Sequence, residues 1–76
     1  MRQRTLRQLG KNVRALRLKR TWSQEQLAEA SNSHVNYVGG IERGERNPTA
    51  TKLVAIAVAL NVELPDLFTG VSTKKR

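Results

Sequence analysis

The first stretch of the chain has apolar residues at helical spacing. They fall three or four positions apart: Leu6, Leu9, Val13 and Leu16. Thr5 is placed to cap this helix, because its hydroxyl can accept a hydrogen bond from a backbone N–H of the first turn. The pattern predicts an amphipathic core helix over residues 5–20, with residues 1–4 as a basic arm ahead of it. Gly10 lies inside the pattern and weakens such a helix by up to about 1 kcal/mol relative to alanine.

A strong helix-start signal stands at Ser23. Ser23 and Gln26 have the spacing of a capping box, in which each side chain accepts a hydrogen bond from the backbone N–H of the other residue. Leu27 and Ala28 then supply apolar packing positions. The polar run at residues 31–33 competes for backbone hydrogen bonds and ends the helix after about two turns.

A second short helix follows at once. Its apolar positions Val38 and Ile41 are spaced i, i+3, and its cap is either Ser33 or His34. Gly44 ends it as a C-terminal glycine. Two short helices joined by a tight turn form a unit that places its second helix in the major groove of DNA.

The apolar run at residues 53–60 is unbroken, so its periodicity does not decide between strand and helix. Thr49 ahead of it as a cap, several alanines within it and Asn61 behind it favour a helix of about three turns. A helix that is apolar all round is buried on more than one side or faces a second molecule. Residues 62–68 predict a last short helix with a proline in its first turn, and residues 71–76 a basic tail.

The composition allows one small domain, residues 1–76, with its folded core at residues 5–70. The 76 residues include no cysteine and a single histidine, so neither disulfides nor a zinc ligand set is available. Lysine and arginine number 14 against 6 acidic residues, a net charge of +8. Most of the cations precede Glu25, and they serve either as a solvated helix face or as a surface for nucleic acid. Neither a membrane span nor a signal sequence is visible, so we expect a cytoplasmic protein.

Three groups of residues together resemble the lambda-repressor-like helix-turn-helix domains of the Xre/Cro type. They are SQEQLA at residues 23–28, IERG with RNP within residues 41–48, and NVELPDLF at residues 61–68. The resemblance covers about residues 5–70. It implies a compact all-α fold of five helices, of which the second and third bind DNA. Residues 37–47 look most like the controller proteins of restriction-modification systems.

The resemblance also indicates which side chains meet duplex DNA in its major groove. Expected base contacts are Val35, Asn36, Tyr37, Gly39 and Arg46, and expected phosphate contacts are Gln24, His34, Arg43, Asn47 and Thr49. Asparagine can form two hydrogen bonds to an adenine, and valine can contact a thymine methyl group. Glu42 can pair with Arg43 or with another neighbour, and the resemblance implies that it is structural.

Several of these positions have two interpretations. Tyr37 either contacts DNA or packs its ring into the core, and Arg46 reaches either a phosphate or a guanine edge. Gly39 and Gly40 permit either a close approach of the backbone to DNA or tight helix packing; Gly40 also lacks a side chain that often touches a base in the family. Ser33 replaces the apolar residue usual at its position, so the register of the second helix can shift by one.

These features favour a sequence-specific DNA-binding transcriptional regulator of the kind that controls a restriction-modification operon. The alternatives are a phage or plasmid repressor, an antitoxin, or a protein-interaction module of the same fold. An enzyme is disfavoured, because no nucleophile with its base, phosphate loop or carboxylate pair is visible. No cofactor, metal or small-molecule ligand is expected. RNA is disfavoured as a partner because one Trp, one Tyr and one Phe provide no stacking platform.

The apolar residues near the carboxy terminus predict a homodimer. Residues 53–60, together with Leu64, Leu67 and Phe68, offer more apolar side chains than one face of a small core needs. A two-fold contact through Leu64, Leu67 and Phe68 would set two DNA-binding helices about 34 Å apart. The expected operator is therefore roughly palindromic.

Overall fold

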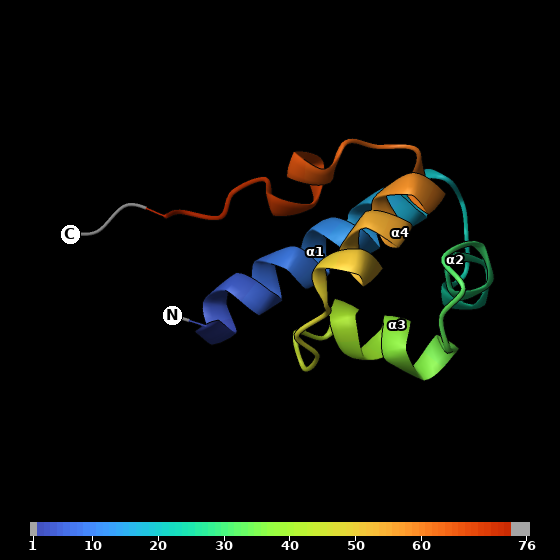
Figure 1. Cartoon of the computed structure of the whole chain (residues 1–76), viewed down its shortest axis with the longest axis horizontal. Helices are drawn as coiled ribbons and strands as arrows, with labels where there is room; N and C mark the ends of the chain where they lie inside the picture. The colour runs from blue at the N-terminus through green and yellow to red at the C-terminus, as the bar shows by residue number, and fades with distance from the viewer. Residues whose placement is uncertain (1, 74–76) are drawn as a thin grey trace.

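The computed structural model describes residues 2–73 and, within them, the side chains of residues 3–73. The described chain forms four α-helices and one 3-10 helix (Figure 1): α1 Arg2–Lys19, α2 Gln24–Ala30, α3 Val35–Glu42, α4 Ala50–Leu60 and η1 Leu64–Phe68. The all-α class is confirmed, but there are four α-helices rather than five. The last segment has only five residues with Pro65 in its first turn, and a stretch this short adopts the tighter 3-10 winding readily.

The first helix begins earlier than expected. α1 starts at Arg2 instead of at Thr5, so residues 2–4 are helical rather than an arm. Arginine and glutamine, which fill these positions, are good helix formers, and they continue the helix without a cap at Thr5. Residues 71–73 of the expected tail are non-helical. Met1 of the expected arm and residues 74–76 of the tail lie outside the described residues.

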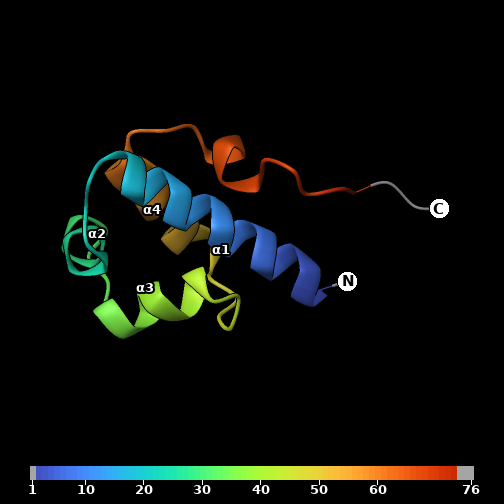
Figure 2. The ribbon, with the colours of Figure 1, turned by 180° about the vertical axis from the view of Figure 1, so that it is seen from behind.

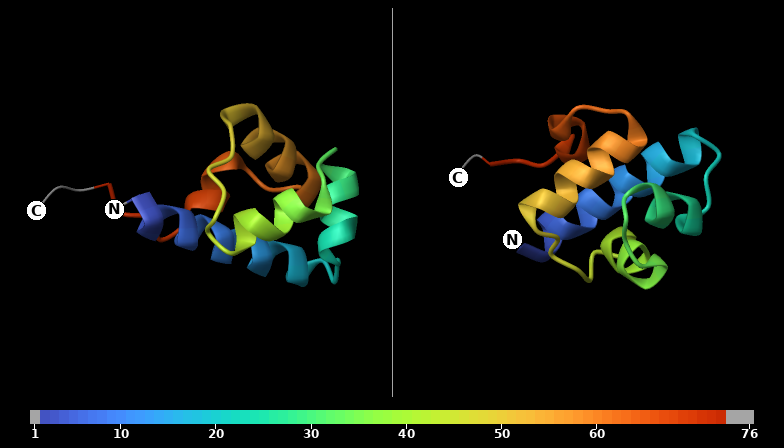
Figure 3. Two further views of the ribbon diagram at one scale, coloured as in Figure 1. Left: turned by 90° about the horizontal axis from the view of Figure 1, so that it is seen from below. Right: turned by 45° about the vertical axis from the view of Figure 1, so that its right-hand side comes forward.

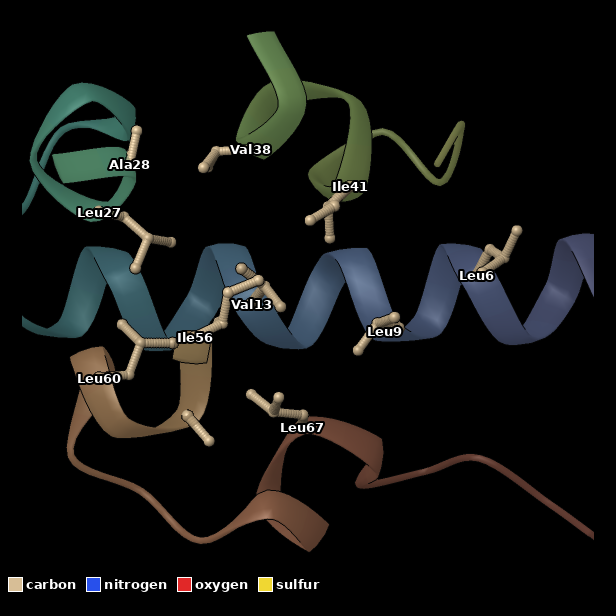
Figure 4. Packing of buried hydrophobic residues seen from close by; sticks show 11 residues of the cluster. Leu6, Leu9, Val13, Leu27, Ala28, Val38, Ile41, Ile56, Leu60 and Leu67 are labelled. Atoms are coloured by element: carbon tan, nitrogen blue, oxygen red, sulfur yellow. The ribbon is translucent and has the colours of Figure 1, made fainter. Parts of the chain in front are cut away.

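α1 is the central element of the fold. Figure 4 shows it running between α2 and α3 on one side and α4 and η1 on the other, and from behind it lies across the front of the molecule (Figure 2). Side chains from all five elements meet along it, and the largest fully buried ones are Leu27, Ile41, Ile56, Leu67, Val13 and Val38. The single core therefore fixes α3 against α1.

Gly10 lies where α1 crosses the end of α3. A Cβ atom on Gly10 would clash with the carbonyl oxygen of Ile41 and would lie 2.6 Å from that of Glu42. Both atoms belong to the backbone and cannot move aside as a flexible side chain can. The glycine that weakens α1 locally thus permits the close contact between α1 and α3.

Local capping sets the three helices that follow α1. The capping box at the start of α2 is confirmed, with Ser23 N donating to Gln26 Oε1 at 2.7 Å and Gln26 N donating to Ser23 Oγ at 3.1 Å. Thr49 caps α4 as expected, its hydroxyl accepting from Lys52 N at 3.2 Å. Gly44 has a φ of 77°, a left-handed conformation that suits glycine at the end of α3.

Candidate nucleic-acid interface

The second helix of the helix-turn-helix unit, α3, is held by its buried side. Val38 and Ile41 are 0% and 1% exposed. Next to them the buried carboxylate of Glu42 accepts two hydrogen bonds from Arg17 of α1, from Nε at 2.7 Å and from Nη2 at 3.0 Å. The hydrogen bonds to Glu42 raise the pKa of Arg17. Glu42 is therefore structural, and its partner is Arg17 rather than Arg43.

The same carboxylate joins α2 to this pair. Gln24, the first residue of α2, donates from Nε2 to Glu42 Oε1 at 3.0 Å, and Arg17 also donates to the carbonyl oxygen of Trp22 at 2.7 Å. Three segments are thus fixed around one buried charge, which sets the angle between α2 and α3. Arg17 could not be identified from the sequence, because 25 residues separate it from its partner.

The N-terminal end of α3 is capped by His34. Its Nδ1 accepts a hydrogen bond from Asn36 N at 3.0 Å, so the open choice between Ser33 and His34 is resolved in favour of His34. Ser33 instead places its hydroxyl 3.0 Å from that of Ser31, which is buried beneath the turn. This pair of hydroxyls takes the place of the apolar residue usual at that position.

The opposite face of α3 has exposed ends, whereas Gly39 and Gly40 between them are buried. Positions 36, 39, 40 and 43 follow the i, i+3, i+4, i+7 spacing of a single helix face, and Asn36 and Arg43 at its two ends are exposed. α3 lies at the surface of the molecule when the ribbon is viewed from below (Figure 3, left). Asn36, at the front of α3, is therefore free to meet a base edge. Val35 is half-buried against the core and has less freedom to do so.

Gly39 and Gly40 are covered by long polar side chains. A Cβ on Gly39 would lie 3.0 Å from Arg43 Nη1 and 3.4 Å from Gln24 Oε1, and a Cβ on Gly40 would lie 2.6 Å from Arg46 Cγ. Neither glycine faces the backbone of another helix as Gly10 does. Both glycines are buried under these side chains, and at Gly39 one of them, Gln24, comes from α2.

Tyr37 joins this face to the core. Its ring is half-buried against the core, and two cations lie over it, with Arg46 Cζ 5.6 Å and Lys52 Nζ 5.9 Å from the ring centre. Lys52 also donates to the carbonyl oxygen of Asn32 in the turn at 3.0 Å. Lys52 was not among the expected contacts. The sequence placed Lys52 three residues after the Thr49 cap, in the first turn of α4, and this position could have indicated that it lies near the other expected contacts.

The remaining expected phosphate contacts surround α3. Arg43 and Glu45 form an exposed ion pair at 3.0 Å, and Asn47 and Thr49 are exposed in the loop and at the start of α4. The structure places these residues at the carboxy-terminal end of α3, whereas Gln24 and His34 lie at the starts of α2 and α3. Gln24 nevertheless lies near Arg43, because a Cβ on Gly39 would contact both side chains, and its amide group bonds to Glu42 at the end of α3. His34 is the expected phosphate contact at the opposite, amino-terminal end of α3.

The expected dimer contacts do not share one exposed surface. Leu67 is 0% exposed, and Phe68 is partly buried against the core, whereas Leu64 is 39% exposed. The expectation that Leu67 lies in a contact between subunits is wrong, because the side chain fills the core beside α1. The most exposed large apolar residues are instead Val58 at 72% and Val54 at 48%, one helical turn apart on α4.

Neither a membrane-spanning helix nor a metal-ligand cluster is found within residues 2–73. No helix there is long and apolar enough to cross a membrane. No three side chains of His, Asp or Glu gather there as a metal site would require.

Four helices around one core, with a capped pair whose second helix is exposed, define a helix-turn-helix domain. The helix-turn-helix family model matches residues 13–67, and the chain belongs to this family. It is 49% identical to control protein C.SmaI of Serratia marcescens over 61 residues, 80% of this chain and 73% of that protein. It is 42% identical to control protein C.BamHI of Bacillus amyloliquefaciens over 60 residues, 78% of this chain and 74% of that protein.

The fold matches solved structures of similar proteins. The restriction-modification controller protein C.AhdI of Aeromonas hydrophila superposes with a TM-score of 0.82 at 41% sequence identity. The match covers 83% of this chain and 96% of that chain. The chain is therefore homologous to restriction-modification controller proteins.

Proposed function

We propose that the chain is a transcriptional regulator that binds the major groove of duplex DNA in the cytoplasm, as a homodimer on a roughly palindromic operator. The observation that carries this proposal is the exposed face of α3, which ends in Asn36 and Arg43 while its opposite face is locked into the core. A recognition helix needs this combination, since its side chains must reach base edges from a fixed backbone. The control proteins to which the chain is similar support a role in a restriction-modification operon.

Within this proposal the two sets of residues have different tasks. Val35, Asn36, Tyr37, Gly39 and Arg46 line the groove, and Gln24, His34, Arg43, Asn47 and Thr49 meet phosphates on its two sides. Gln24 lies at the start of α2, where backbone N–H groups and the helix dipole attract an anion. Phosphate contacts supply affinity and register, and base contacts supply the preference for one sequence.

Selection of bound sites from random duplex DNA tests the proposal. We expect the recovered sites to share two inverted half-sites with centres about one helical turn, or 34 Å, apart. The genes beside the coding sequence then test the operon: a methyltransferase and an endonuclease gene are expected there. Recovery of no common sequence, with binding to a protein instead, would support an interaction module and contradict the proposal.

For the dimer we propose a contact centred on Val54 and Val58 of α4, with Leu64 of η1 beside it. These are exposed large apolar side chains on neighbouring elements, and their burial against a second copy would be self-complementary about a two-fold axis. Val58→Asp should give a folded monomer, because the side chain is 72% exposed. Sedimentation together with circular dichroism distinguishes that result from unfolding.

Leu67→Asp is the matched comparison for the dimer. It places the same charge in the core, where Leu67 is 0% exposed, and should unfold the domain rather than separate two subunits. A wild-type chain that stays monomeric at high micromolar concentration, with and without operator DNA, would contradict the dimer.

A further inference from the structure

Four cations form a stripe along α1. Arg4, Arg7, Lys11 and Arg14 are spaced i, i+3, i+7, i+10, which places them along one side of the helix, and all four are exposed. We call them the α1 stripe. At 1.5 Å per residue the stripe extends about 15 Å along the helix axis.

The stripe is not neutralised within the described part of the molecule. The ion pairs of residues 3–73 are Arg17 with Glu42 and Arg43 with Glu45, and both use other cations. An open hollow of about 280 Å³ lies along the stripe, lined by Arg4, Arg7, Gln8 and Lys11. Like charges on neighbouring turns repel one another, so this arrangement favours an external anion.

The stripe adjoins the end of the recognition helix. A Cβ on Gly44, two residues after the end of α3, would lie 2.8 Å from Arg7 Cγ. Arg7 therefore lies beside the segment of the chain that carries Arg43 and Arg46. Seen from below, the amino-terminal half of α1 projects beyond this end of α3 (Figure 3, left).

We propose that the α1 stripe is a second phosphate-binding surface, which holds the backbone of the same duplex that α3 enters. This inference rests on the proposed function and adds contacts that neither the helix-turn-helix unit nor the following loop provides. Duplex DNA carries one phosphate charge per about 1.7 Å of its axis, so a stripe of about 15 Å can meet more than one phosphate. The stripe contributes affinity and leaves base preference unchanged, since phosphates carry no direct sequence information.

Two lysines of α1 provide a matched test. Lys11→Gln and Lys19→Gln make the same substitution at exposed positions of one helix and remove the same charge, but only Lys11 belongs to the stripe. We would measure the affinity of each variant for the selected duplex and for a scrambled duplex of equal length. The salt concentration is varied from about 0.05 to about 0.3 M, so that the slope of log affinity against log salt is well defined.

For Lys11→Gln we expect the plot of log affinity against log salt to become shallower by about 0.9, which corresponds to an affinity loss of about eightfold at 0.1 M salt. The loss should be equal on both duplexes, and Lys19→Gln should keep the wild-type slope. The double variant Arg7→Gln/Lys11→Gln should lose about twice the slope, and ethylation interference should show fewer contacted phosphates for it than for the wild type.

Two results would overturn the inference: equal slopes for Lys11→Gln and the wild type, or equal changes in the two lysine variants, which would indicate only a diffuse field. Failure of the proposed function itself gives a different result. In that case the wild type would bind the selected and scrambled duplexes alike, whatever the lysine variants do.

Discussion

The two faces of α3 differ in what holds them. On the buried face, Val38 and Ile41 are almost completely enclosed, and Glu42 is fixed by Arg17 and Gln24. On the other face two adjacent glycines, Gly39 and Gly40, are buried under side chains: those of Gln24 and Arg43 over the first and that of Arg46 over the second. The core thus fixes the backbone of α3 on one side, whereas long polar side chains cover the other side.

The largest expected effect lies on the buried face. Arg17→Ala leaves the Glu42 carboxylate, 2% exposed, without its charged partner, and removal of one member of a buried pair costs about 3–5 kcal/mol. Urea unfolding should show this loss, and DNA binding should disappear with the fold. Glu45→Ala, which breaks the exposed pair with Arg43, is the control and should cost less than about 1 kcal/mol. Equal costs for the two variants would show that the buried pair has no special role.

Gly10→Ala and Gly39→Ala make the same change on the two kinds of surface. At Gly10 the new methyl group meets backbone carbonyls, and such overpacking costs about 1–3 kcal/mol, more than the gain in helix propensity. At Gly39 it meets the ends of the Arg43 and Gln24 side chains, so the propensity gain of up to about 1 kcal/mol should dominate. Thermal unfolding should lower Tm for the first variant and raise it for the second. If Tm shifted in the same direction for both variants, the distinction between backbone neighbours at Gly10 and side-chain neighbours at Gly39 would be contradicted.

Asn36→Ala tests the exposed face for base contacts. If Asn36 forms two hydrogen bonds to an adenine, the substitution should cost about 1–3 kcal/mol of binding and relax preference at one base pair. Stability should change little, because Asn36 is exposed. Binding to a set of duplexes with single base-pair changes measures the preference. An unchanged preference at every position would remove Asn36 from the site.

Arg43→Ala and Gln24→Ala should act on all sequences alike. Loss of Arg43 is expected to make the salt slope shallower by about one unit without altering base preference. Gln24 carries no charge, so its loss should weaken binding but leave the slope nearly unchanged. An altered base preference in either variant would reassign that residue from phosphate to base.

Gly40→Ala should have a small effect on stability and a larger one on DNA. Its Cβ would lie 2.6 Å from Arg46 Cγ, so Arg46 must leave its place over the Tyr37 ring. The gain in helix propensity, up to about 1 kcal/mol, is then partly offset. We expect weaker operator binding at nearly unchanged Tm. Unchanged binding would show that operator DNA binding does not depend on the position of Arg46 over Gly40.

The sequence predicted features that depend on neighbouring residues. The caps at Ser23 and Thr49 and the glycine at the end of α3 are set within a few positions, so the helix boundaries around the helix-turn-helix unit followed from spacing. The Arg17 to Glu42 pair and the contact at Gly10 depend on how α1 crosses α3. No local pattern encodes that crossing, and both features were missed.

The burial of side chains in α4 and η1 also could not be predicted from local sequence patterns. An unbroken apolar run has no polar positions to indicate which side is buried, so the exposure of Val58 and Val54 did not follow from residues 53–60. Leu67 was expected on the surface with Leu64, but η1 turns Leu67 into the core and leaves Leu64 outside. The 3-10 winding of η1 also changes which side chains share a face, because it has three residues per turn.

Competition binding measures whether the chain recognises a specific DNA sequence. The wild-type chain is titrated at 0.15 M salt with the duplex recovered by selection and with a scrambled duplex of equal length. We expect the selected duplex to bind at least about 10³-fold more tightly, the lower end of what specific regulators achieve. Equal affinity for the two duplexes would contradict sequence-specific recognition by α3.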